Sequence, residues 1–372
     1  VSPSRGLGDV YKRQMETLGV PATAGDVTAA WLTGALRSGG LDTEASVSSF
    51  TATPIGEAVG LMGEITKFDL TWDLAGQEPR SVVLKVPSVL EENRALGLAL
   101  GLYEGEHRVY TEIASDLGVA VPRCWYAAGD ALTGEYALLI DDLTDLDRVD
   151  QMDGVDLPTA ESCVDVLSDL HARWWNSDEL AALDWLADGT GESLQVFRDL
   201  VVASLPGFVE AYREVLTADD LETCRRFAEG FDTLIEASLD SDVTLLHRDY
   251  RVDNMLFDAG SPVVLDWGGV ARGGALYDLA YFLAGSLTIE NRRAYADRLQ
   301  QRYIDRLDDR GIVIEDFEAA HRVNALFCLI VPIMVGGATL NARDEKGREL
   351  TLEGVRRLMA YLSDYEAVTA LE

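Results

Sequence analysis

The residues best suited to chemistry lie in one short segment in the second half of the chain. Residues 247–254 read His-Arg-Asp-Tyr-Arg-Val-Asp-Asn, and Asp266 follows Asn254 by twelve positions, after the apolar run 263–265. The whole chain has only 4 His. A His-x-Asp-x-x-x-x-Asn match is therefore expected roughly 0.006 times in a shuffled chain. Together with Asp266, the pattern indicates a functional site.

These residue types suit the transfer of a phosphoryl group. The reaction needs a carboxylate to orient a substrate hydroxyl and accept its proton, and hard oxygen ligands to hold Mg²⁺ against a triphosphate. We expect Asp249 to be the catalytic base and His247 to anchor the loop through hydrogen bonds to the backbone. Asn254 and Asp266 are the expected Mg²⁺ ligands. The alternative is a plain polar turn between two strands, since Asp and Asn favour turns, but it leaves Asp266 unexplained.

Length and composition predict a globular protein large enough for two lobes. The chain has 372 residues, of which 48% are hydrophobic, and this is enough to bury a large core. With 64 acidic and 31 basic residues its formal net charge is −33, so nucleic acid and anionic membranes are not expected as partners. Because the acidity is spread along the whole chain, it does not indicate the charge of the substrate.

Cysteine spacing and hydropathy predict a cytoplasmic protein. The four cysteines lie far apart and form no Cys-x-x-Cys pair, which favours reduced thiols over disulfides or a zinc site. No secretory signal is evident, and the longest apolar stretch, 325–335, is too short to span a bilayer and contains Pro332. We expect a buried, kinked helix there. Residues 1–14 have the character of a non-native leader and are left out of the fold prediction.

The order of the expected elements gives an α+β protein with two lobes. Apolar periodicity and turn residues predict strands over 47–54, 65–72, 81–86 and 136–140, and helices over 24–37, with Asp26 as a cap, and over 91–117. From about residue 160 the pattern is mainly helical. We therefore predict an N-terminal nucleotide-binding lobe over 15–142 and a catalytic and acceptor-binding lobe over 143–372.

Lys85 lies inside the apolar strand 82–86 of the smaller lobe. A charge there costs several kcal/mol unless it is paired, so a carboxylate partner is expected. Glu106 on the following helix is the candidate, with Glu104, Glu91 and Glu92 as competitors. Such a Lys–Glu pair can place the ammonium on the α- and β-phosphates of ATP. The alternative is an edge-strand lysine that extends to solvent.

Glycines and the strand end near residue 140 complete the predicted nucleotide site. Gly60 and Gly63 lie between the first two strands, where backbone N–H groups can approach phosphates, although plain hairpin turns use the same residues. Ile140 and Asp141 fall where the lobes should join, so their backbone is the expected contact for the adenine ring. An acidic surface linker is the alternative for this second segment.

Three other features favour structural roles. The stretches 292–310 and 343–357 alternate charge in a helical pattern, which predicts solvated helix faces. His171, Trp174 and Trp175 form an aromatic cluster at helical spacing, which is more typical of core packing than of a cofactor site.

Taken together, these residues resemble the small-molecule branch of the kinase superfamily, the aminoglycoside phosphotransferase and choline kinase-like group. The greatest likeness is to the ecdysteroid kinase-like (CHK kinase-like) phosphotransferases. It spans nearly the whole chain from about residue 45, and it rests on the segments 83–87, 103–110, 136–143, 170–175, 247–254 and 276–282.

The resemblance implies a bilobal protein-kinase-like fold with a small antiparallel-β N-lobe, one main helix in that lobe, and a large, mostly helical C-lobe. It implies ATP and Mg²⁺ as cofactors and the roles given above to the residues of segment 247–254 and to Asp266. It also implies that Asp278 braces the catalytic loop from the start of a helix. In this group the helix glutamate precedes a tyrosine by four positions, which favours Glu106 with Tyr110.

The chain departs from the family pattern at two places. Small-molecule kinases usually have Gly where this chain has Arg248, and many relatives have Trp-Glu or Phe-Gln where it has Trp267-Gly268. The resulting His-Arg-Asp is similar to that of protein kinases, but only eleven residues separate Asp266 from Asp278, which leaves no room for their activation loop. Protein kinase activity is therefore not expected, and we interpret Arg248 as a local salt-bridge residue.

The sequence thus predicts a cytoplasmic, ATP- and Mg²⁺-dependent O-phosphotransferase that transfers the γ-phosphate to a hydroxyl of a small organic molecule. One alternative is a catalytically silent nucleotide-binding scaffold. Another is an antibiotic kinase acting on aminoglycosides or macrolides. The acceptor stays open among a steroid-like alcohol, a hydroxyacyl thioester, an amino alcohol and an antibiotic, because acceptor pockets leave no linear motif. The oligomeric state is likewise open.

Overall fold

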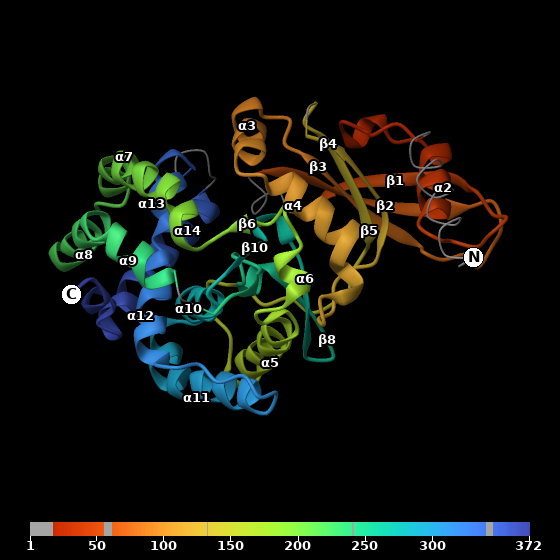
Figure 1. The fold of residues 1–372 in the computed structure, drawn as a ribbon. Helices are drawn as coiled ribbons and strands as arrows, with labels where there is room; N and C mark the ends of the chain where they lie inside the picture. The colour runs from red at the N-terminus through yellow and green to blue at the C-terminus, as the bar shows by residue number, and fades with distance from the viewer. Residues whose placement is uncertain (1–17, 56–61, 132, 240–241, 340–344) are drawn as a thin grey trace. The chain divides into compact units, whose positions relative to one another are not determined.

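The structure, a computed structural model, describes residues 18–55, 62–131, 133–239, 242–339 and 345–372. The chain divides into two compact units. The first comprises the chain up to Asp116, Val121–Asp145 and Trp267–Gly269. The second comprises Leu117–Ala120, Leu146–Asp266 and Val270–Glu372. Figure 1 shows that the first unit is built around a sheet and the second is mainly helical.

The first unit contains a five-stranded antiparallel sheet in the order β1-β2-β3-β5-β4. Its strands are β1 (Val47–Ile55), β2 (Gly63–Trp72), β3 (Ser81–Pro87), β4 (Cys124–Asp130) and β5 (Glu135–Asp141). Four of them agree with the sequence prediction. The fifth, β4, was not predicted; two Ala and one Gly weaken its strand pattern.

One face of this sheet is covered by helix α2 (Ala29–Ser38), whose Leu32 and Leu36 are fully buried against the strands. The cap of α2 is Thr28, which accepts from the N–H of Trp31. The prediction that Asp26 caps this helix was wrong. Asp26 ends a separate 3₁₀ turn, η1 (Ala24–Asp26), and its carboxylate binds the backbone of the residue that precedes that turn.

The predicted continuous helix over 91–117 is broken in the structure. It consists of α3 (Glu91–Ala99), α4 (Leu102–Arg108), the π turn η2 (Val109–Ile113) and the 3₁₀ turn η3 (Ala114–Asp116). The break falls at Gly101, whose φ of 69° lies in the left-handed region that glycine adopts without strain. Helix α4 packs on β4 and β5.

The second unit consists of ten helices among the described residues, together with two small sheets. The helices are α5 (Leu157–Trp174), α6 (Asp178–Ala181), α7 (Gln195–Ala211), α8 (Ala218–Glu229), α9 (Phe231–Ser238), α10 (Leu276–Gly285), α11 (Ile289–Asp308), α12 (Phe317–Phe327), α13 (Ile330–Thr339) and α14 (Glu345–Asp364). The strands are β6 (Ala187–Asp188), β7 (Thr244–Leu246), β8 (Met255–Asp258), β9 (Ser261–Val264) and β10 (Ala271–Gly273). They form a β8-β9 hairpin and a sheet ordered β6-β10-β7.

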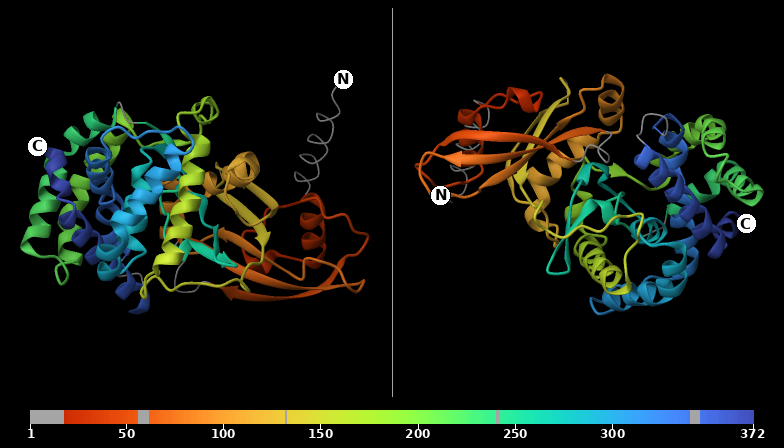
Figure 2. Two further views of the ribbon diagram at one scale, coloured as in Figure 1. Left: turned by 90° about the horizontal axis from the view of Figure 1, so that it is seen from below. Right: turned by 180° about the vertical axis from the view of Figure 1, so that it is seen from behind.

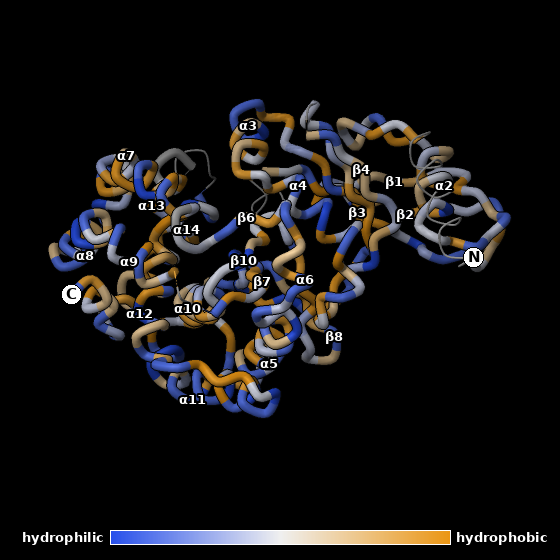
Figure 3. The backbone as a smooth tube through the Cα atoms, in the orientation of Figure 1, coloured by the Kyte–Doolittle hydropathy of each residue, from blue (hydrophilic) through white to orange (hydrophobic). Residues whose placement is uncertain are grey.

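Helix α10 lies at the centre of the second unit, and eight of its ten residues are buried. It contacts α5, α11, α12 and α14, and Figure 3 shows the hydrophobic character of its residues. Helices α5 and α11 run side by side (Figure 2). They are joined by Arg298–Glu161, Arg302–Asp165 and Arg306–Asp169 ion pairs.

The two charge-rich stretches, 292–310 and 343–357, were predicted to be solvated helix faces. In the structure, part of each stretch is buried. Arg292 on α11 is 2% exposed and pairs with Asp364. Arg357 on α14 is 3% exposed and donates to the carbonyl oxygens of Gln151 and Met152. Each guanidinium finds oxygen acceptors on another element, so its burial leaves no unpaired charge. Charge alternation along a helix could not reveal those partners.

The apolar stretch near residue 330 forms the end of α12 and the start of α13. The helices separate at residues 328–329, and Pro332 lies in the first turn of α13, where its missing N–H costs little. The window Phe317–Gly336 is long and apolar enough to cross a membrane, but 56% of it is buried within the protein. Helix α13 packs against α7.

Candidate active site

The segment 247–254 follows β7 and ends in the short 3₁₀ turn η5 (Val252–Asn254), which leads directly into β8. His247 is completely buried. Its Nδ1 accepts from the N–H of Asp249 at 3.2 Å, and its Nε2 lies 2.9 Å from the carbonyl oxygen of Leu265. Because that oxygen can only accept, His247 is the neutral tautomer with its proton on Nε2. It ties the loop to the end of β9.

Asp278, in the first turn of α10, holds the beginning of the loop. Its buried carboxylate accepts from the backbone N–H of His247 at 2.7 Å and of Arg248 at 2.9 Å. These are the bracing contacts that the family resemblance implied. His171 lies behind it, with Nε2 3.4 Å from Asp278 and Nδ1 2.7 Å from the hydroxyl of Tyr303. His171 is thus a core residue, as expected, and it also supports Asp278.

The carboxylate of Asp249 is held from three sides. Its Oδ1 accepts from Nε of Arg251 at 3.0 Å and from the hydroxyl of Tyr281 at 2.9 Å. Its Oδ2 accepts from Nδ2 of Asn254 at 2.7 Å. The side chain still keeps 33% of its surface exposed. Asp249 is therefore fixed in orientation while one part of it stays accessible to a reactant.

The donors around Asp249 keep their protons over a wide pH range. Burial alone would lower the pKa of Arg251, but the carboxylates around it, Asp249 first among them, outweigh burial and raise it. Burial, and then the charge of Asp249, raises the pKa of Tyr281 well above its usual value. Neither residue had been singled out from the sequence. The only local signal was the spacing of Arg251 two positions after Asp249.

Arg251 also connects the loop to a distant segment. Its Nη1 donates to Oε1 of Gln151 at 3.0 Å and to Oδ2 of Asp253 at 3.3 Å. The carbonyl of Gln151 in turn accepts from Arg357. A continuous series of hydrogen bonds therefore runs from α14 to the carboxylate of Asp249. Because Gln151 is 100 residues away in sequence, no local pattern could have predicted this link.

Asn254 and Asp266 lie close together beside Asp249. The Nδ2 of Asn254 donates to the backbone oxygen and to Oδ2 of Asp249, at 2.9 and 2.7 Å. This leaves Oδ1 of the amide as the oxygen that can bind a metal. The N–H of Leu265 donates to the carbonyl of Asn254 at 2.9 Å, so Asp266 follows immediately. The φ of Asp266 is 61°, a left-handed conformation typical of functional positions.

The donor set suits Mg²⁺ better than a metal held wholly by protein side chains. Within the described ranges, no group of three or more His, Cys, Asp or Glu residues could hold a metal ion. The candidate ligands are one amide oxygen and one carboxylate, from Asn254 and Asp266. Mg²⁺ is usually bound by one or two such ligands and completes its shell with phosphate oxygens and water.

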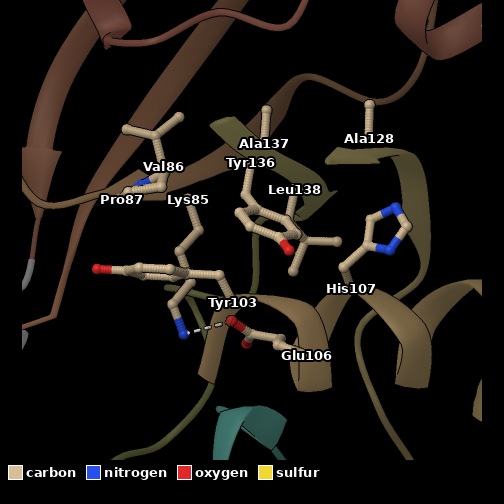
Figure 4. Close-up of a pocket in the computed structure, with 10 residues that line it drawn as sticks. All are labelled: Lys85, Val86, Pro87, Tyr103, Glu106, His107, Ala128, Tyr136, Ala137 and Leu138. Atoms are coloured by element: carbon tan, nitrogen blue, oxygen red, sulfur yellow. Dashed lines mark ion pairs between the residues drawn. The ribbon is translucent and has the colours of Figure 1, made fainter. Parts of the chain in front are cut away.

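In the first unit, Lys85 on β3 pairs with Glu106 on α4, with Nζ 2.7 Å from Oε2. Figure 4 shows the two side chains directed toward each other. Their side chains are 19% and 10% exposed. Glu104, the competing partner, pairs with Arg108 instead. The pocket around this pair is lined by Lys85, Val86, Pro87, Tyr103, Glu106, His107, Ala128, Tyr136, Ala137 and Leu138.

Gly63, the second predicted phosphate-loop glycine, lies at the start of β2 opposite Pro87. A Cβ added there would lie 3.0 Å from the carbonyl oxygen of Val86 and 3.7 Å from Cε of Lys85. The position thus keeps the backbone close to the lysine side chain, which a larger residue would prevent. Gly60, the other predicted glycine, lies outside the described residues.

Ile140 and Asp141, the predicted adenine contacts, lie near the end of β5. Ile140 stands between Val83 of β3 and Cys124 of β4. The N–H of Asp141 donates to the carbonyl of Arg123 at 2.9 Å, and its carboxylate accepts from the indole of Trp125 at 2.7 Å. Asp141 is therefore tied to its own sheet by both main chain and side chain. Its contact with a base stays a prediction.

Asp142, next along the chain, is a buried carboxylate: its side chain is 4% exposed and lies 2.7 Å from Nζ of Lys67. Burial by itself would raise the pKa of Asp142. Hydrogen bonds from Lys67, Ser81 and Thr144 outweigh it and lower the pKa to about 2. This residue therefore acts as a fixed negative charge that joins the end of β5 to β2 and β3.

Among the residues that the structure describes, Arg248 has no carboxylate partner, so the salt bridge predicted for it was wrong. Its guanidinium carbon lies 5.8 Å from the ring centroid of Phe197 and 5.6 Å from that of Tyr277. The nearby carboxylates of Asp249 and Asp278 already accept from other donors. Arg248 also has a φ of 65°, a conformation that Gly adopts without strain. Glycine, which the family resemblance implies at this position, would carry no such strain.

Comparison with protein families identifies the chain over most of its length. Residues 70–313 match the phosphotransferase enzyme family, APH. No curated protein sequence matches the chain.

Several solved structures share the fold. The Plasmodium vivax ethanolamine kinase has a TM-score of 0.54 and 12% identity, covering 97% of this chain and 95% of its own. The GDP complex of wild-type aminoglycoside 2′-phosphotransferase-IIIa gives 0.53 and 14%, covering 85% of this chain and 94% of its own. The gentamicin complex of APH(2″)-IIa gives 0.52 and 14%, with the same coverages of 85% and 94%. The chain therefore belongs to the phosphotransferase enzyme family, and it is a small-molecule phosphotransferase with a bilobal protein-kinase-like fold.

Proposed function

We propose that this protein transfers the γ-phosphate of ATP to a hydroxyl group of a small organic acceptor, with Asp249 as the catalytic base. The observation that carries the proposal is the geometry of this carboxylate. Arg251, Tyr281 and Asn254 hold it by three hydrogen bonds, and a third of its surface remains exposed. A carboxylate held in this way can orient an acceptor hydroxyl and remove its proton as the new P–O bond forms.

Transfer in this proposal is direct, without a phosphorylated enzyme intermediate. Both ring nitrogens of His247 are engaged in hydrogen bonds, so it is not free to attack phosphorus. Burial raises the pKa of Cys124 and of Cys224 to about 12, and that of Cys163 and Cys328 further, so these thiols stay protonated. All four are free cysteines, which also supports the proposed location in the reducing cytoplasm.

Asn254 and Asp266 would hold Mg²⁺, which supplies positive charge to neutralise the triphosphate when it is bound. The support is the free Oδ1 of the Asn254 amide, set by the bonds that its Nδ2 makes to Asp249, and the carboxylate that follows Leu265. The role of the chain itself is to present these oxygens already oriented, so that little reorganisation is needed at the moment of transfer.

Lys85 is proposed to bind the α- and β-phosphates, with Glu106 fixing the ammonium. The support is the ion pair of 2.7 Å, which holds the lysine side chain in one direction within a pocket lined mainly by buried residues. Gly60, Gly63 and the backbone of Ile140 and Asp141 complete the proposed nucleotide contacts. One structure of similar fold contains GDP, so ATP and GTP should both be tried as donors.

The proposal is tested by nucleoside diphosphate release across a panel of hydroxylated metabolites. The Asp249→Ala protein serves as the blank, and Asp258→Ala, an exposed position at the end of β8, as the matched control. We expect at least one compound to raise release in the wild type and in Asp258→Ala but not in Asp249→Ala. If no compound does so and ATP still raises the melting temperature, a nucleotide-binding scaffold without catalysis becomes the better description.

An antibiotic kinase is the second candidate, because the chain belongs to the APH family and shares its fold with an aminoglycoside phosphotransferase. It would use the same residues and differ only in the acceptor. Expression in a sensitive strain separates the two cases: growth on aminoglycosides or macrolides that depends on Asp249 supports it. Unchanged sensitivity, together with transfer to a metabolite, excludes it.

A further inference from the structure

Arg248 is exceptional among the arginines of the second unit. Of those that the structure describes, it is the one without a carboxylate oxygen within 4 Å; each of the others forms at least one ion pair. This is unexpected in a chain with 64 acidic and 31 basic residues. The guanidinium is half-buried and lies against the rings of Phe197 and Tyr277.

Arg248 is strained in its backbone, and no carboxylate of a described residue pairs with its guanidinium. Its φ is 65°, a left-handed conformation that is unfavourable for a residue with a side chain. The two contacts of the guanidinium with aromatic rings are individually weak, so they offset this strain without a clear net gain. The charge stands immediately beside Asp249, the proposed base. Stability alone therefore gives no reason for an arginine here.

A second polar group next to Arg248 also lacks a partner. Tyr277 is 4% exposed, and its hydroxyl is buried without a hydrogen bond to any described residue. The ring of Tyr277 is the one on which the Arg248 guanidinium lies, and it stacks on Tyr281, which holds Asp249. A buried hydroxyl without a partner is destabilising, and oxygen atoms of a bound anion would satisfy both it and the guanidinium.

We propose that Arg248 and Tyr277 form an anion-binding site, so that the acceptor is a hydroxyl compound that also carries a negatively charged oxygen group. This rests on the proposed function, because it names the acceptor class for the reaction at Asp249. In this proposal the guanidinium turns from the Tyr277 ring to the anion, and the buried hydroxyl of the same ring donates to that anion. An amino alcohol such as ethanolamine would place a second positive charge beside Arg248 and be rejected.

The test uses matched acceptors that differ only in charge. Pairs such as 4-hydroxybutyrate with 4-hydroxybutyramide, and 4-(hydroxymethyl)benzoate with 4-(hydroxymethyl)benzamide, vary the spacer between hydroxyl and anion. A hydroxyalkyl phosphate and ethanolamine are the third and fourth arms. Wild type, Arg248→Gln and Tyr277→Phe are compared with Arg213→Gln, which removes the same charge from an exposed site. Binding of each compound to the protein with MgADP is measured by calorimetry, independently of turnover.

We expect wild type and Arg213→Gln to prefer the anion over its matched amide by at least about tenfold in kcat/KM, since a charge-assisted hydrogen bond is lost in the amide. Arg248→Gln should lose that preference, and Tyr277→Phe should weaken it severalfold without lowering the melting temperature. The anion is identified as a carboxylate or a phosphate by the compound whose kcat/KM depends most on Arg248.

Three results would overturn the anion site. The first is that Arg248→Gln keeps the wild-type ratio of anion to amide, and the second is that ethanolamine is the best acceptor. The third is that no anion binds the MgADP complex more weakly in Arg248→Gln than in wild type. If anions bind in an Arg248-dependent manner while no compound is phosphorylated, the anion site stands and the proposed transferase activity fails. The two proposals are therefore distinguishable.

Discussion

Replacement of Asp278 by Asn weakens the hydrogen bonds that hold the loop 247–254 without changing any residue of the loop itself. The fully buried carboxylate accepts from the N–H of His247 at Oδ2 and from the N–H of Arg248 at Oδ1, and Nε2 of His171 lies 3.4 Å from Oδ2. An asparagine amide keeps one acceptor oxygen and turns an NH₂ group toward the second N–H. One buried N–H then loses its partner, and the other bond becomes neutral rather than charge-assisted.

The structure gives the size of this effect. A hydrogen bond to a charged group contributes about 1.5–3 kcal/mol, and a neutral one about 1 kcal/mol. The loss of one charged bond and the weakening of another sum to about 3 kcal/mol. For a cooperative unit of the size of the second unit, a shift of roughly 2–4 °C per kcal/mol then predicts a melting temperature about 6–12 °C lower. Because Asp249 follows directly after these two residues, misplacement by about 1 Å would also reduce kcat about 100-fold.

Calorimetry and steady-state kinetics on Asp278→Asn test this, with Asp308→Asn, an exposed position on α11, as the matched control. The control should melt within about 1 °C of wild type, as surface substitutions do. The KM for ATP should change little in either variant, since the contacts of Asp278 are with the loop backbone and with His171, and not with Lys85 or Glu106. An Asp278→Asn protein with wild-type melting temperature and kcat would refute the reasoning that this carboxylate holds the loop.

Three other perturbations follow from the structure. Burial lowers the pKa of His321 to about 4, so below about pH 6.5 the unfolded chain takes up a proton on this residue while the folded protein does not. The free energy of unfolding should therefore fall by about 2 kcal/mol between pH 7 and pH 5. Urea titrations of His321→Gln should lack this part of the pH dependence. Arg251→Gln should lower kcat at least tenfold with little change in the KM for ATP, because Oδ1 of Asp249 loses its charged donor and keeps only the Tyr281 hydroxyl; equal loss in kcat and ATP affinity would contradict a positioning role. Glu106→Gln should raise the KM for ATP about tenfold by freeing Lys85, and unchanged nucleotide affinity would remove the pair from nucleotide binding.

Local patterns in the sequence were sufficient for much of the fold and for the composition of the site. Spacing placed Asp249, Asn254 and Asp266 in one cluster, and the charge in an apolar strand required a partner for Lys85. Strand alternation located four of five strands of the first sheet. These features depend on neighbours in sequence, or on the cost of an unpaired charge, and both can be evaluated without coordinates.

The contacts that orient Asp249 could not be predicted in the same way. The Tyr281 hydroxyl reaches it from α10, and Gln151 reaches Arg251 from a segment 100 residues earlier. Arg248 was assigned a local salt bridge because the eleven residues between Asp266 and Asp278 leave no room for an activation loop. The nearby carboxylates are those of Asp249 and Asp278. In the folded chain those carboxylates already accept hydrogen bonds from other donors, so the guanidinium lies on aromatic rings instead. Such competition among donors depends on three-dimensional distances.

The most direct test of Asp249 as the base is to measure binding and transfer separately in the same variants. Equilibrium binding of Mn²⁺–ATP by electron paramagnetic resonance reports the metal–nucleotide complex, and a single turnover of γ-labelled ATP with an identified acceptor reports transfer. We predict that Asp249→Ala binds Mn²⁺–ATP almost as wild type does and transfers no phosphate. Asp266→Ala should lose both phosphate transfer and the bound metal. Two results would contradict the assignment. One is transfer by Asp249→Ala at the wild-type rate. The other is that Asp249→Ala fails to bind the metal–nucleotide complex while Asp266→Ala binds it normally.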